Sequence, residues 1–214
     1  MFAENLPNDR KDQLIKGLTQ LPADWAITPL LGNKAPYRDK WQHEDPMPRT
    51  DIKKAVQQGD LINYTKKDNS TYQKRKFPQG YGIRTGTISG GIVAVDLDGP
   101  SAAPKVMEMS GGASLPKTVA FTSGRPGRSQ HLFKIPEQYW AAIKTTKIKT
   151  GVTGDDGKPE QVEFRWNGCQ SVLPPSVHPT TGQYQWVGGC APWECEMAFA
   201  PLWLIELMLV DQTI

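Results

Sequence analysis

The sequence has few of the features that mark secreted or membrane proteins. It contains three cysteines in 214 residues, an odd number, and a chain of this length does not depend on disulfide bonds for its stability. No run approaches the roughly 18 consecutive apolar residues that a membrane-spanning helix needs. The first residues lack the apolar core of a signal peptide. These absences favour a cytoplasmic protein with no membrane partner.

The net charge of the chain is also small. The chain has 25 basic and 22 acidic side chains and a net charge of +3, so its overall charge does not require a nucleic-acid partner. The basic side chains are nevertheless clustered, in residues 65–76, at Arg125 and Arg128, and in residues 144–149. Each cluster is either solvated surface or, where the clusters surround one site, a phosphate-binding surface.

Residues that could form a zinc site are scarce and badly spaced. Cys169, Cys190, Cys195 and His178 are the candidates, and their closest pair is separated by four residues. This spacing matches no common zinc motif. We therefore expect the three cysteines to be ordinary packing residues.

The hydrophobic pattern predicts a mixed α+β protein without internal repeats. Residues 1–20 place Leu14, Ile15 and Leu18 on one helical face. A second helix is expected to begin with Thr50 as its N-cap and to end at Gly59. Further helices are predicted over residues 101–113, 136–145 and 201–209, and a polar loop over residues 65–80.

Strands are predicted wherever β-branched and aromatic residues are bounded by turn residues. The expected strands cover residues 24–31, 81–86, 91–99, 118–124, 129–135 and 161–166, with short strands and turns after residue 167. From residue 91 the order is strand, helix, strand, strand, helix, strand. This is the βαββαβ order of an RRM-like sheet. We expect one domain, with an N-terminal αβ module (residues 1–90), an RRM-like catalytic module (91–195) and a C-terminal helix (196–214).

Two carboxylates stand at the end of the most apolar strand. Residues i and i+2 of a strand share a face, so Asp96 and Asp98 lie side by side while Val93, Val95 and Leu97 form the opposite, buried face. Adjacent carboxylates repel each other, and a divalent cation between them removes that repulsion. Oxygen ligands at this spacing suit Mg2+ or Mn2+. The alternative is a pair of solvated carboxylates at a strand end.

Two other strands carry polar pairs with the same spacing. Ser129 and His131 share one face of their strand, opposite Gln130; they are either structural residues or part of a site that the neighbouring arginine-rich turn completes. Glu163 and Arg165 share a face of a later strand. They form either a salt bridge at a sheet edge or a third acid with a phosphate-binding cation.

Taken in order, these segments resemble the bifunctional primase-polymerase branch of the archaeo-eukaryotic primase superfamily. The family pattern is DxD or DxE on an apolar strand, then SxH, then a hydrophobic residue before an acid. The sequence has Asp96 and Asp98, Ser129 and His131, and Glu163, although aspartate is commoner at the last position. The resemblance covers residues 21–195. The segments that surround the motifs and also look like the family are WAITPLLGNKAPYRDKWQ, GIRTGTISGGIVAVDLDG and SVLPPSVHPTTGQYQW.

The resemblance implies a primase fold and template-directed nucleotidyl transfer by two metal ions, Mg2+ or Mn2+. Asp96, Asp98 and Glu163 would hold the metals, and Ser129 and His131 would contact the incoming triphosphate. The further candidates for nucleotide contacts are Arg84, Arg128, Arg165 and His178.

The implied partners are a single-stranded DNA template with its primer, and dNTP or NTP substrates. The basic segments 65–76 and 144–149 would follow the template backbone. A helicase domain or partner is also expected, because proteins of this branch often carry one. Tyr37 and Tyr81 are the candidates for contacts with the sugar.

Two alternatives use the same residues differently. The segment VAVDLDG also matches the nucleophile motif of haloacid-dehalogenase-type phosphatases, in which Asp96 would be phosphorylated and Asp98 would act as acid and base. That motif normally opens its fold, whereas about ninety residues precede it here. The other alternative is a non-catalytic RRM-like nucleic-acid-binding module. Such sheets stack bases on exposed aromatics, and the strand at residues 91–99 has none.

Overall fold

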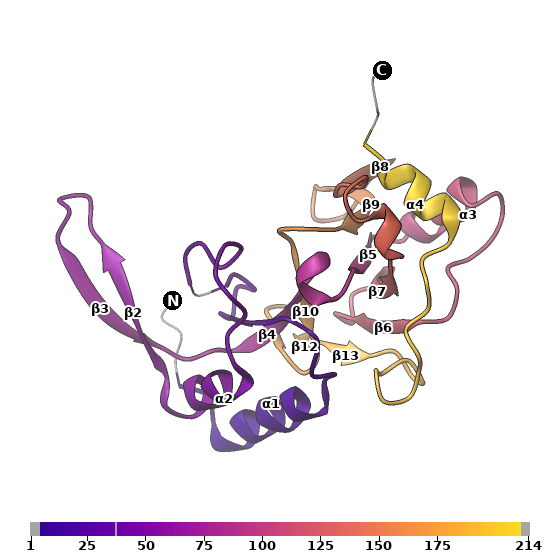
Figure 1. Cartoon of the computed structure of the whole chain (residues 1–214). Coiled ribbons are helices and arrows are strands. Elements are labelled where there is room, and N and C mark those ends of the chain that lie inside the picture. Colours follow the sequence, from indigo (N-terminus) through magenta and orange to yellow (C-terminus); the bar gives the residue numbers. More distant parts are fainter. Residues whose placement is uncertain (1–4, 37, 211–214) are drawn as a thin grey trace.

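The computed structural model describes residues 5–36 and 38–210 (Figure 1). Within these residues the chain combines short helices with sheets in which every strand pairing is antiparallel. The predicted α+β class is therefore confirmed. No helix among the described residues is long and apolar enough to cross a membrane.

A six-stranded sheet in the order β13-β6-β7-β5-β9-β8 forms the centre of the molecule. Its middle part, β6-β7-β5-β9, has the strand order of the split βαβ motif that the sequence predicted from residue 91 onward. In chain order the strands are β5 (Ile92–Asp98), β6 (Val119–Thr122), β7 (Arg128–Lys134), β8 (Thr146–Thr153), β9 (Pro159–Arg165) and β13 (Gln185–Trp186).

The prediction of a helix over residues 136–145 is wrong. This segment contains only the 3-10 turn η2 (Glu137–Tyr139), after which the chain enters β8, a strand that the sequence analysis missed. The Trp140 indole donates a hydrogen bond to the Ile135 carbonyl, 2.8 Å away, and fixes the turn. The β-branched residues that follow then pair with β9, so cross-strand pairing outweighs helix propensity.

The two faces of β5 belong to different cores. Val93, Val95 and Leu97 pack beneath α3 (Ala102–Met109) and α4 (Leu202–Met208), which lie over the same region of the sheet (Figure 1). This confirms both helices and the predicted buried face. Ile92 and Ala94, on the other face, join the core that the N-terminal part of the chain builds. Asp96 and Asp98 therefore lie on the face turned toward the N-terminal part.

A smaller sheet with two helices forms that N-terminal part. Its strands are β1 (Ile27–Leu30), β4 (Gly80–Arg84) and β10 (Gln170–Leu173), in the order β1-β4-β10. Because β10 comes from the second half of the chain, the two expected modules share a sheet. The division into modules stays a prediction.

The two N-terminal helices, α1 (Asn8–Gln20) and α2 (Arg49–Gln58), lie side by side (Figure 1). Leu14 and Leu18 of α1 are fully buried, as predicted. Residues 1–4 of the first expected helix lie outside the described part. The N-cap of α2 is Pro48 rather than Thr50, because Pro48 pre-sets the backbone angle at the helix start. Gly59 ends the helix as expected.

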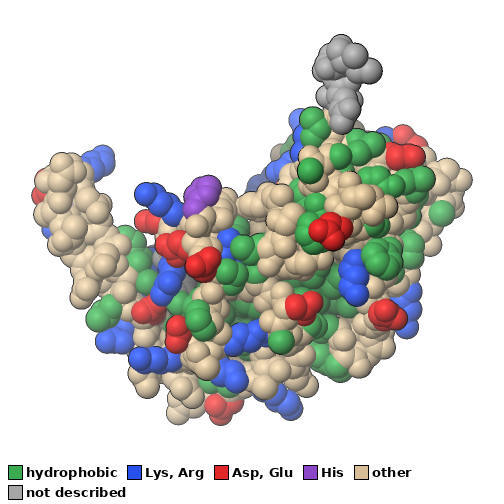
Figure 2. Space-filling view, in the orientation of Figure 1, with side chains coloured by type: hydrophobic (Ala, Val, Ile, Leu, Met, Phe, Trp, Pro, Cys, Tyr) green, Lys and Arg blue, Asp and Glu red, His purple; other side chains and the backbone are tan. Residues whose placement is uncertain are grey.

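Residues 60–76 form a β-hairpin, whereas a polar loop was predicted over residues 65–80. Strands β2 (Asp60–Thr65) and β3 (Thr71–Lys76) pair only with each other among the described strands, and we call residues 60–76 the hairpin arm. The rings of Tyr64 and Tyr72, directly opposite across the pair, stack 5.4 Å apart. Such cross-strand aromatic pairs stabilise hairpins, and the polar composition hid this one. The arm stands away from the body (Figures 1 and 2).

Three short elements complete the described fold. Turn η1 (Thr87–Ser89) precedes β5, and the small pair β11 (Val177–His178) and β12 (Gly182–Gln183) follows β10. Short strands after residue 167 were predicted and are confirmed. They bring the histidine-containing turn beside the central sheet, where the candidate site lies.

Candidate functional site

A cavity of about 320 Å³ lies between the central sheet and the smaller sheet. Its walls come from both sheets and from the turns that follow β1, β6 and β8. Most lining residues are charged or polar, with an aromatic and aliphatic part on one side. The described lining residues are Lys34, Asp96, Asp98, Phe121, Ser123, Arg125, Arg128, Ser129, Gln130, Asp156, Lys158, Arg165, Gln170, Val172, His178 and Tyr184.

Strand register brings the predicted acids together. Asp96 lies directly opposite Gln130 of β7 and Glu163 of β9. Residues directly opposite in an antiparallel pair share a face, so Asp96 and Glu163 are neighbours on the cavity side. Asp98 lies two residues further along the same face, opposite Arg128. Asp96 and Asp98 line the cavity, and Glu163 is buried beside it, 7% exposed.

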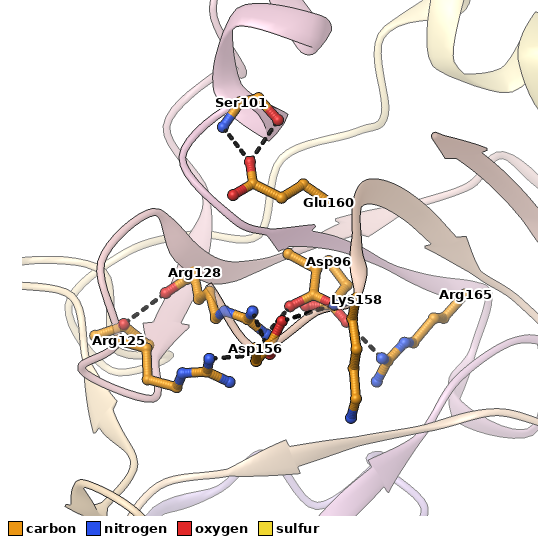
Figure 3. Close-up of polar contacts among 10 residues, drawn as sticks. Asp96, Ser101, Arg125, Arg128, Asp156, Lys158, Glu160 and Arg165 are labelled. Atoms are coloured by element: carbon orange, nitrogen blue, oxygen red, sulfur yellow. Dashed lines mark hydrogen bonds and ion pairs between the residues drawn. The ribbon is translucent and has the colours of Figure 1, made fainter. Parts of the chain in front are cut away.

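Each of these acids is paired with a cation. The Arg165 guanidinium forms an ion pair with Asp96 and donates from Nε to Glu163 Oε2 at 3.0 Å. Arg128 forms an ion pair with Asp98, and Lys147 Nζ lies 3.2 Å from Glu163 Oε1. In Figure 3, Arg128 and Arg165 approach Asp96 and its neighbours from opposite sides. The carboxylate row is therefore neutralised by the protein's own side chains.

Burial controls the electrostatics of the central pair. Burial raises the pKa of Asp96, and the charges of Asp98 and Glu163 raise it further, against the opposing effects of Arg165 and a hydrogen bond from Gln130. Burial alone would lower the pKa of Arg165, but the charges of Asp96 and Glu163 outweigh it and the net pKa is raised. Arg165 thus remains charged, and Asp96 is the carboxylate most in need of a cation.

Two turns meet over the cavity through a shared aspartate. Asp156, in the β8–β9 turn, accepts from Arg125 at 3.1 Å and from Arg128 at 3.0 Å. Arg125 belongs to the β6–β7 turn, and Arg128 is the first residue of β7. That turn lies directly against the end of β5, since a Cβ on Gly127 (φ 65°) would come within 2.4 Å of the Pro100 nitrogen. Arg128 therefore bridges Asp98 and Asp156, and its approach to Asp156 is visible in Figure 3.

Lys34 reaches the cavity from the turn after β1. Its backbone is in the left-handed region, with φ 69°, which costs about 1 kcal/mol or more for a residue other than glycine. Gln170 Nε2 donates to the Lys34 carbonyl at 3.2 Å and holds this conformation. Burial lowers the pKa of Lys34, and the nearby Arg125 lowers it further. The turn thus directs a cation into an already positive region.

His178 and Tyr184 form part of the opposite wall. His178 is 5% exposed, and its Nδ1 accepts from the backbone nitrogens of Thr180 and Thr181 at 3.3 and 3.2 Å. The ring therefore orders its turn and also lines the cavity, with Nε2 left as the ring nitrogen that carries the proton in the neutral form. The Tyr184 ring packs edge-on against it at 5.2 Å, and burial raises the pKa of Tyr184 to about 12.

The structure does not bring His131 into the cavity. His131 lies opposite Val95, and Ser129 lies opposite Leu97, so the register turns both side chains to the face of β5 opposite Asp96 and Asp98, although Ser129, unlike His131, borders the cavity. The Ser129 hydroxyl and His131 Nε2 are 3.0 Å apart, and burial lowers the pKa of His131 to about 4. The shared face of the two residues was predicted correctly, but alternation alone did not reveal which side of the sheet it takes.

Arg84 is also placed elsewhere. Its guanidinium donates to the carbonyls of Glu44 and Gln42, at 2.8 and 3.0 Å, beside a separate cavity of about 190 Å³. Its role is to fix the loop before α2, because it is only 5% exposed. Tyr81, a candidate for sugar contacts, is fully buried away from the main cavity, and Tyr37 lies outside the described residues.

Several cavity residues were not singled out by the sequence analysis. Lys34 and Lys158 lie in glycine- and proline-containing turns that looked like surface, and Gln130 was treated only as a spacer between Ser129 and His131. The signal for Gln130 was present, because alternation puts it on the face opposite His131, but its use required the register. The missed lining residues are Lys34, Phe121, Ser123, Gln130, Lys158, Gln170, Val172 and Tyr184, and Asp156 was considered only for the phosphatase alternative.

Within the described residues, no group of three His, Cys, Asp or Glu side chains is arranged to hold a metal ion. The donor chemistry of the cavity nevertheless fits a hard divalent cation: Asp96, Asp98 and Glu163 offer only oxygen atoms, on one face of adjacent strands. Arg128 and Arg165 take the carboxylate oxygens that a cation would need. The three cysteines are free thiols, Cys190 buried and Cys169 and Cys195 half-buried.

Comparison with known proteins agrees with this geometry. No curated protein matches the chain. A family model, described as the N-terminal domain of bifunctional DNA primase/polymerase, matches residues 18–203. That span contains every residue that lines the cavity and favours this family over the phosphatase alternative. The chain therefore belongs to the bifunctional DNA primase/polymerase family, in which nucleotidyl transfer is the characteristic activity.

Proposed function

We propose that the chain is a template-directed nucleotidyltransferase that joins nucleotides on single-stranded DNA, with the cavity between the two sheets as its active site. The observation that carries the proposal is the composition of that cavity: a row of partly buried carboxylates lies next to an excess of cationic side chains. Carboxylates attract divalent cations and the cationic side chains attract phosphates. A nucleoside triphosphate with its metal ions needs both kinds of group at one place.

The cations suit the triphosphate. The five cationic side chains among the described lining residues outnumber the three carboxylates there. Lys34 and Lys158 form no ion pair with any described residue, and both reach the cavity. Arg125, Arg128 and Arg165 would exchange their carboxylate partners for phosphate oxygens. A guanidinium binds either group through two parallel hydrogen bonds, so this exchange retains its geometry.

The carboxylates suit the metal ions. Asp96, Asp98 and Glu163 would hold Mg2+ or Mn2+ once the arginines have turned to the phosphates. When bound, the metals would lower the pKa of the attacking 3′-hydroxyl and stabilise the leaving pyrophosphate. Burial makes the charge of Asp96 costly without a cation, which supports its role as a ligand.

The less polar side of the cavity suits the nucleoside. Phe121, Val172 and Tyr184 provide apolar surface, and the Tyr184 hydroxyl stays protonated at neutral pH because burial raises its pKa to about 12. The buried Gln130 Oε1 has no hydrogen-bond partner among the described residues. A sugar hydroxyl or a base amine would satisfy it. We propose these residues for the sugar and base, in place of Tyr81.

Primer synthesis on single-stranded DNA tests the proposal. The parent and the double variant Asp96→Ala/Asp98→Ala are incubated with labelled dNTPs or NTPs, with Mg2+ and with Mn2+. We expect metal-dependent products from the parent and a loss of about a hundredfold to a thousandfold or more in the variant, the scale on which the removal of one group that stabilises transition-state charge acts. Circular dichroism verifies that the variant is folded.

Asp155→Ala is the matched control, because Asp155 is an exposed acid in the β8–β9 turn that does not line the cavity. It should retain the parent's activity. Equal synthesis by the parent and the double variant would contradict the site. Absence of synthesis by the parent, with retained DNA binding, would favour a non-catalytic nucleic-acid-binding module. A helicase partner and a cytoplasmic location stay predictions.

A further inference from the structure

The hairpin arm is one of the strongly basic segments of the described chain. Residues 60–76 contain five lysines or arginines and two aspartates, so their net charge equals the net charge of +3 of the whole chain. The rest of the protein is neutral in sum. The arm lies at the opposite end of the molecule from α3 and α4 (Figure 1) and is separated from the body by a hollow (Figure 2).

The two faces of the arm differ in chemistry. Cross-strand pairs put Ile62, Tyr64, Tyr72, Lys74 and Lys76 on one face, with Asp60 at its base opposite Lys76. The Lys76 ammonium lies 4.7 Å from the centroid of the Tyr64 ring, and the Lys66 ammonium lies 5.7 Å from that of Tyr72. This face therefore alternates rings and cations along its length.

The opposite face is built differently. Apart from Leu61 and Arg75, it consists of uncharged polar residues, and the Gln73 amide donates to Asn63 Oδ1 at 3.0 Å across the pair. If lysines served only to keep an exposed hairpin soluble, they would not need to be concentrated on the aromatic face. The asymmetry indicates a binding face.

The base of the arm is held firmly. Gly59, with φ 72°, joins it to α2, and a Cβ there would come within 2.8 Å of the Arg75 side chain. Arg75 donates to the Gln58 carbonyl at 2.8 Å, and Arg38 forms an ion pair with Asp60 at 3.1 Å. A two-stranded hairpin alone is marginally stable, so these contacts present the arm in a fixed direction.

We infer that the ring-and-lysine face of the hairpin arm binds single-stranded nucleic acid, holding the template away from the catalytic cavity. Stacked rings accept bases of any sequence, and the lysines between them neutralise phosphates. Tyr72 is 44% exposed, so a base can reach its ring. The Tyr64 hydroxyl is buried without a hydrogen-bond partner among the described residues, and a phosphate oxygen that reached it would accept a hydrogen bond from it. Only the identity of the strand as template rests on the proposed function.

The test is fluorescence anisotropy with a labelled oligothymidylate and the full chain, over a range of salt concentrations. Tyr72→Ala should weaken binding about tenfold, since a base stacked on an aromatic ring contributes on that scale. Tyr72→Phe should restore it. Lys66→Gln/Lys76→Gln should weaken binding and make the logarithmic salt dependence shallower by about 1.4, corresponding to two phosphate contacts.

The matched control is Lys16→Gln/Lys54→Gln, which removes the same charge from exposed positions of α1 and α2. It should bind within about twofold of the parent. If the arm variants bind like this control with an unchanged salt dependence, or if only binding of a blunt duplex is weakened, the inference is overturned. Absence of measurable binding by the parent at low salt would overturn it as well.

Failure of the proposed function would look different. Asp96→Asn/Asp98→Asn should bind the oligonucleotide as the parent does, because both aspartates lie in the cavity and not on the arm. A parent that binds through the arm and synthesises nothing would refute the proposed reaction and leave the arm's role intact. Normal synthesis by the parent, together with DNA binding that the arm substitutions do not weaken, would support the proposed reaction and refute the arm's role.

Discussion

Lys34 has a backbone conformation that lysine rarely adopts and that glycine adopts readily. A glycine substitution can therefore remove the side chain and test its contact with the nucleotide without destabilising the turn. In Lys34→Gly the backbone strain disappears while glycine's greater freedom in the unfolded chain costs about 0.5–1 kcal/mol, so the thermal midpoint should change little. The KM for nucleotides should rise about tenfold or more, because a hydrogen bond from a charged donor contributes about 1.5–3 kcal/mol. Thermal unfolding and steady-state kinetics measure the two effects.

Lys40→Gly is the control for this substitution. Lys40 is an exposed lysine with φ 60° that does not line the cavity. Its replacement should leave both the thermal midpoint and the KM near the parent's values. Equal KM values for the two variants would show that Lys34 serves the turn and not the triphosphate.

His131 gives the protein a pH-dependent stability. Burial lowers its pKa from 6.5 to about 4. Between pH 4 and 6.5, His131 is therefore protonated in the unfolded chain and neutral in the folded chain. The stabilisation is complete above about pH 6.5 and is lost as the pH falls toward 4. Compared with His131→Gln, the parent should lose on the order of 2 kcal/mol more of its unfolding free energy over this interval.

Urea unfolding at several pH values measures this difference. The comparison with His131→Gln removes the contribution of carboxylates, which titrate alike in both proteins. Parallel stability curves for the parent and the variant would indicate that His131 takes up its proton in the folded state, and therefore that its side chain is not buried on the α3–α4 face.

At the scale of secondary-structure elements, the contact between the β6–β7 region and the β8–β9 turn depends on the Asp156 carboxylate. Asp156→Asn would release Arg125 and Arg128 from a shared ion pair. Partly exposed pairs contribute about 0–1 kcal/mol to stability, so the fold should be unaffected. Both guanidiniums would become more available to phosphate, and the KM for nucleotides should fall about two- to fivefold.

The neighbouring Asp155→Asn makes the same chemical change outside the cavity and should leave the KM unchanged. A higher KM in Asp156→Asn would instead indicate that the aspartate positions the arginines for binding. Steady-state kinetics at fixed metal concentration distinguishes the two outcomes.

Sequence reasoning identified most helices and strands, but not the strands that form only because another strand pairs with them. The β-branched residues of Ile92–Asp98 predict a strand, and the apolar run of Leu202–Met208 predicts the helix α4. In contrast, β8 exists because β9 offers a pairing edge, and the hairpin arm exists because two tyrosines meet across it. Neither condition can be read from a local window, since both depend on which residue lies opposite.

At the scale of the whole molecule, the site is shared by both sheets. Asp96 and Asp98 were predictable because two carboxylates on an apolar strand need compensation. Lys34 and Gln170 were not, because they reach the cavity only through the pairing of β1 and β10 with β4. The acids therefore follow from local pattern, whereas the cations around them follow from tertiary structure.

The register of β7, β5 and β9 has a consequence for length variation. Asp96, Gln130 and Glu163 form a row because each strand presents alternate residues to the cavity. Inserting or deleting one residue within any of these strands would turn the following side chains to the other face, exchanging Gln130 for His131 or Glu163 for Phe164. The three strands should therefore resist single-residue insertions and deletions. The tip of the hairpin arm, which sets no register in the cavity, should accommodate them.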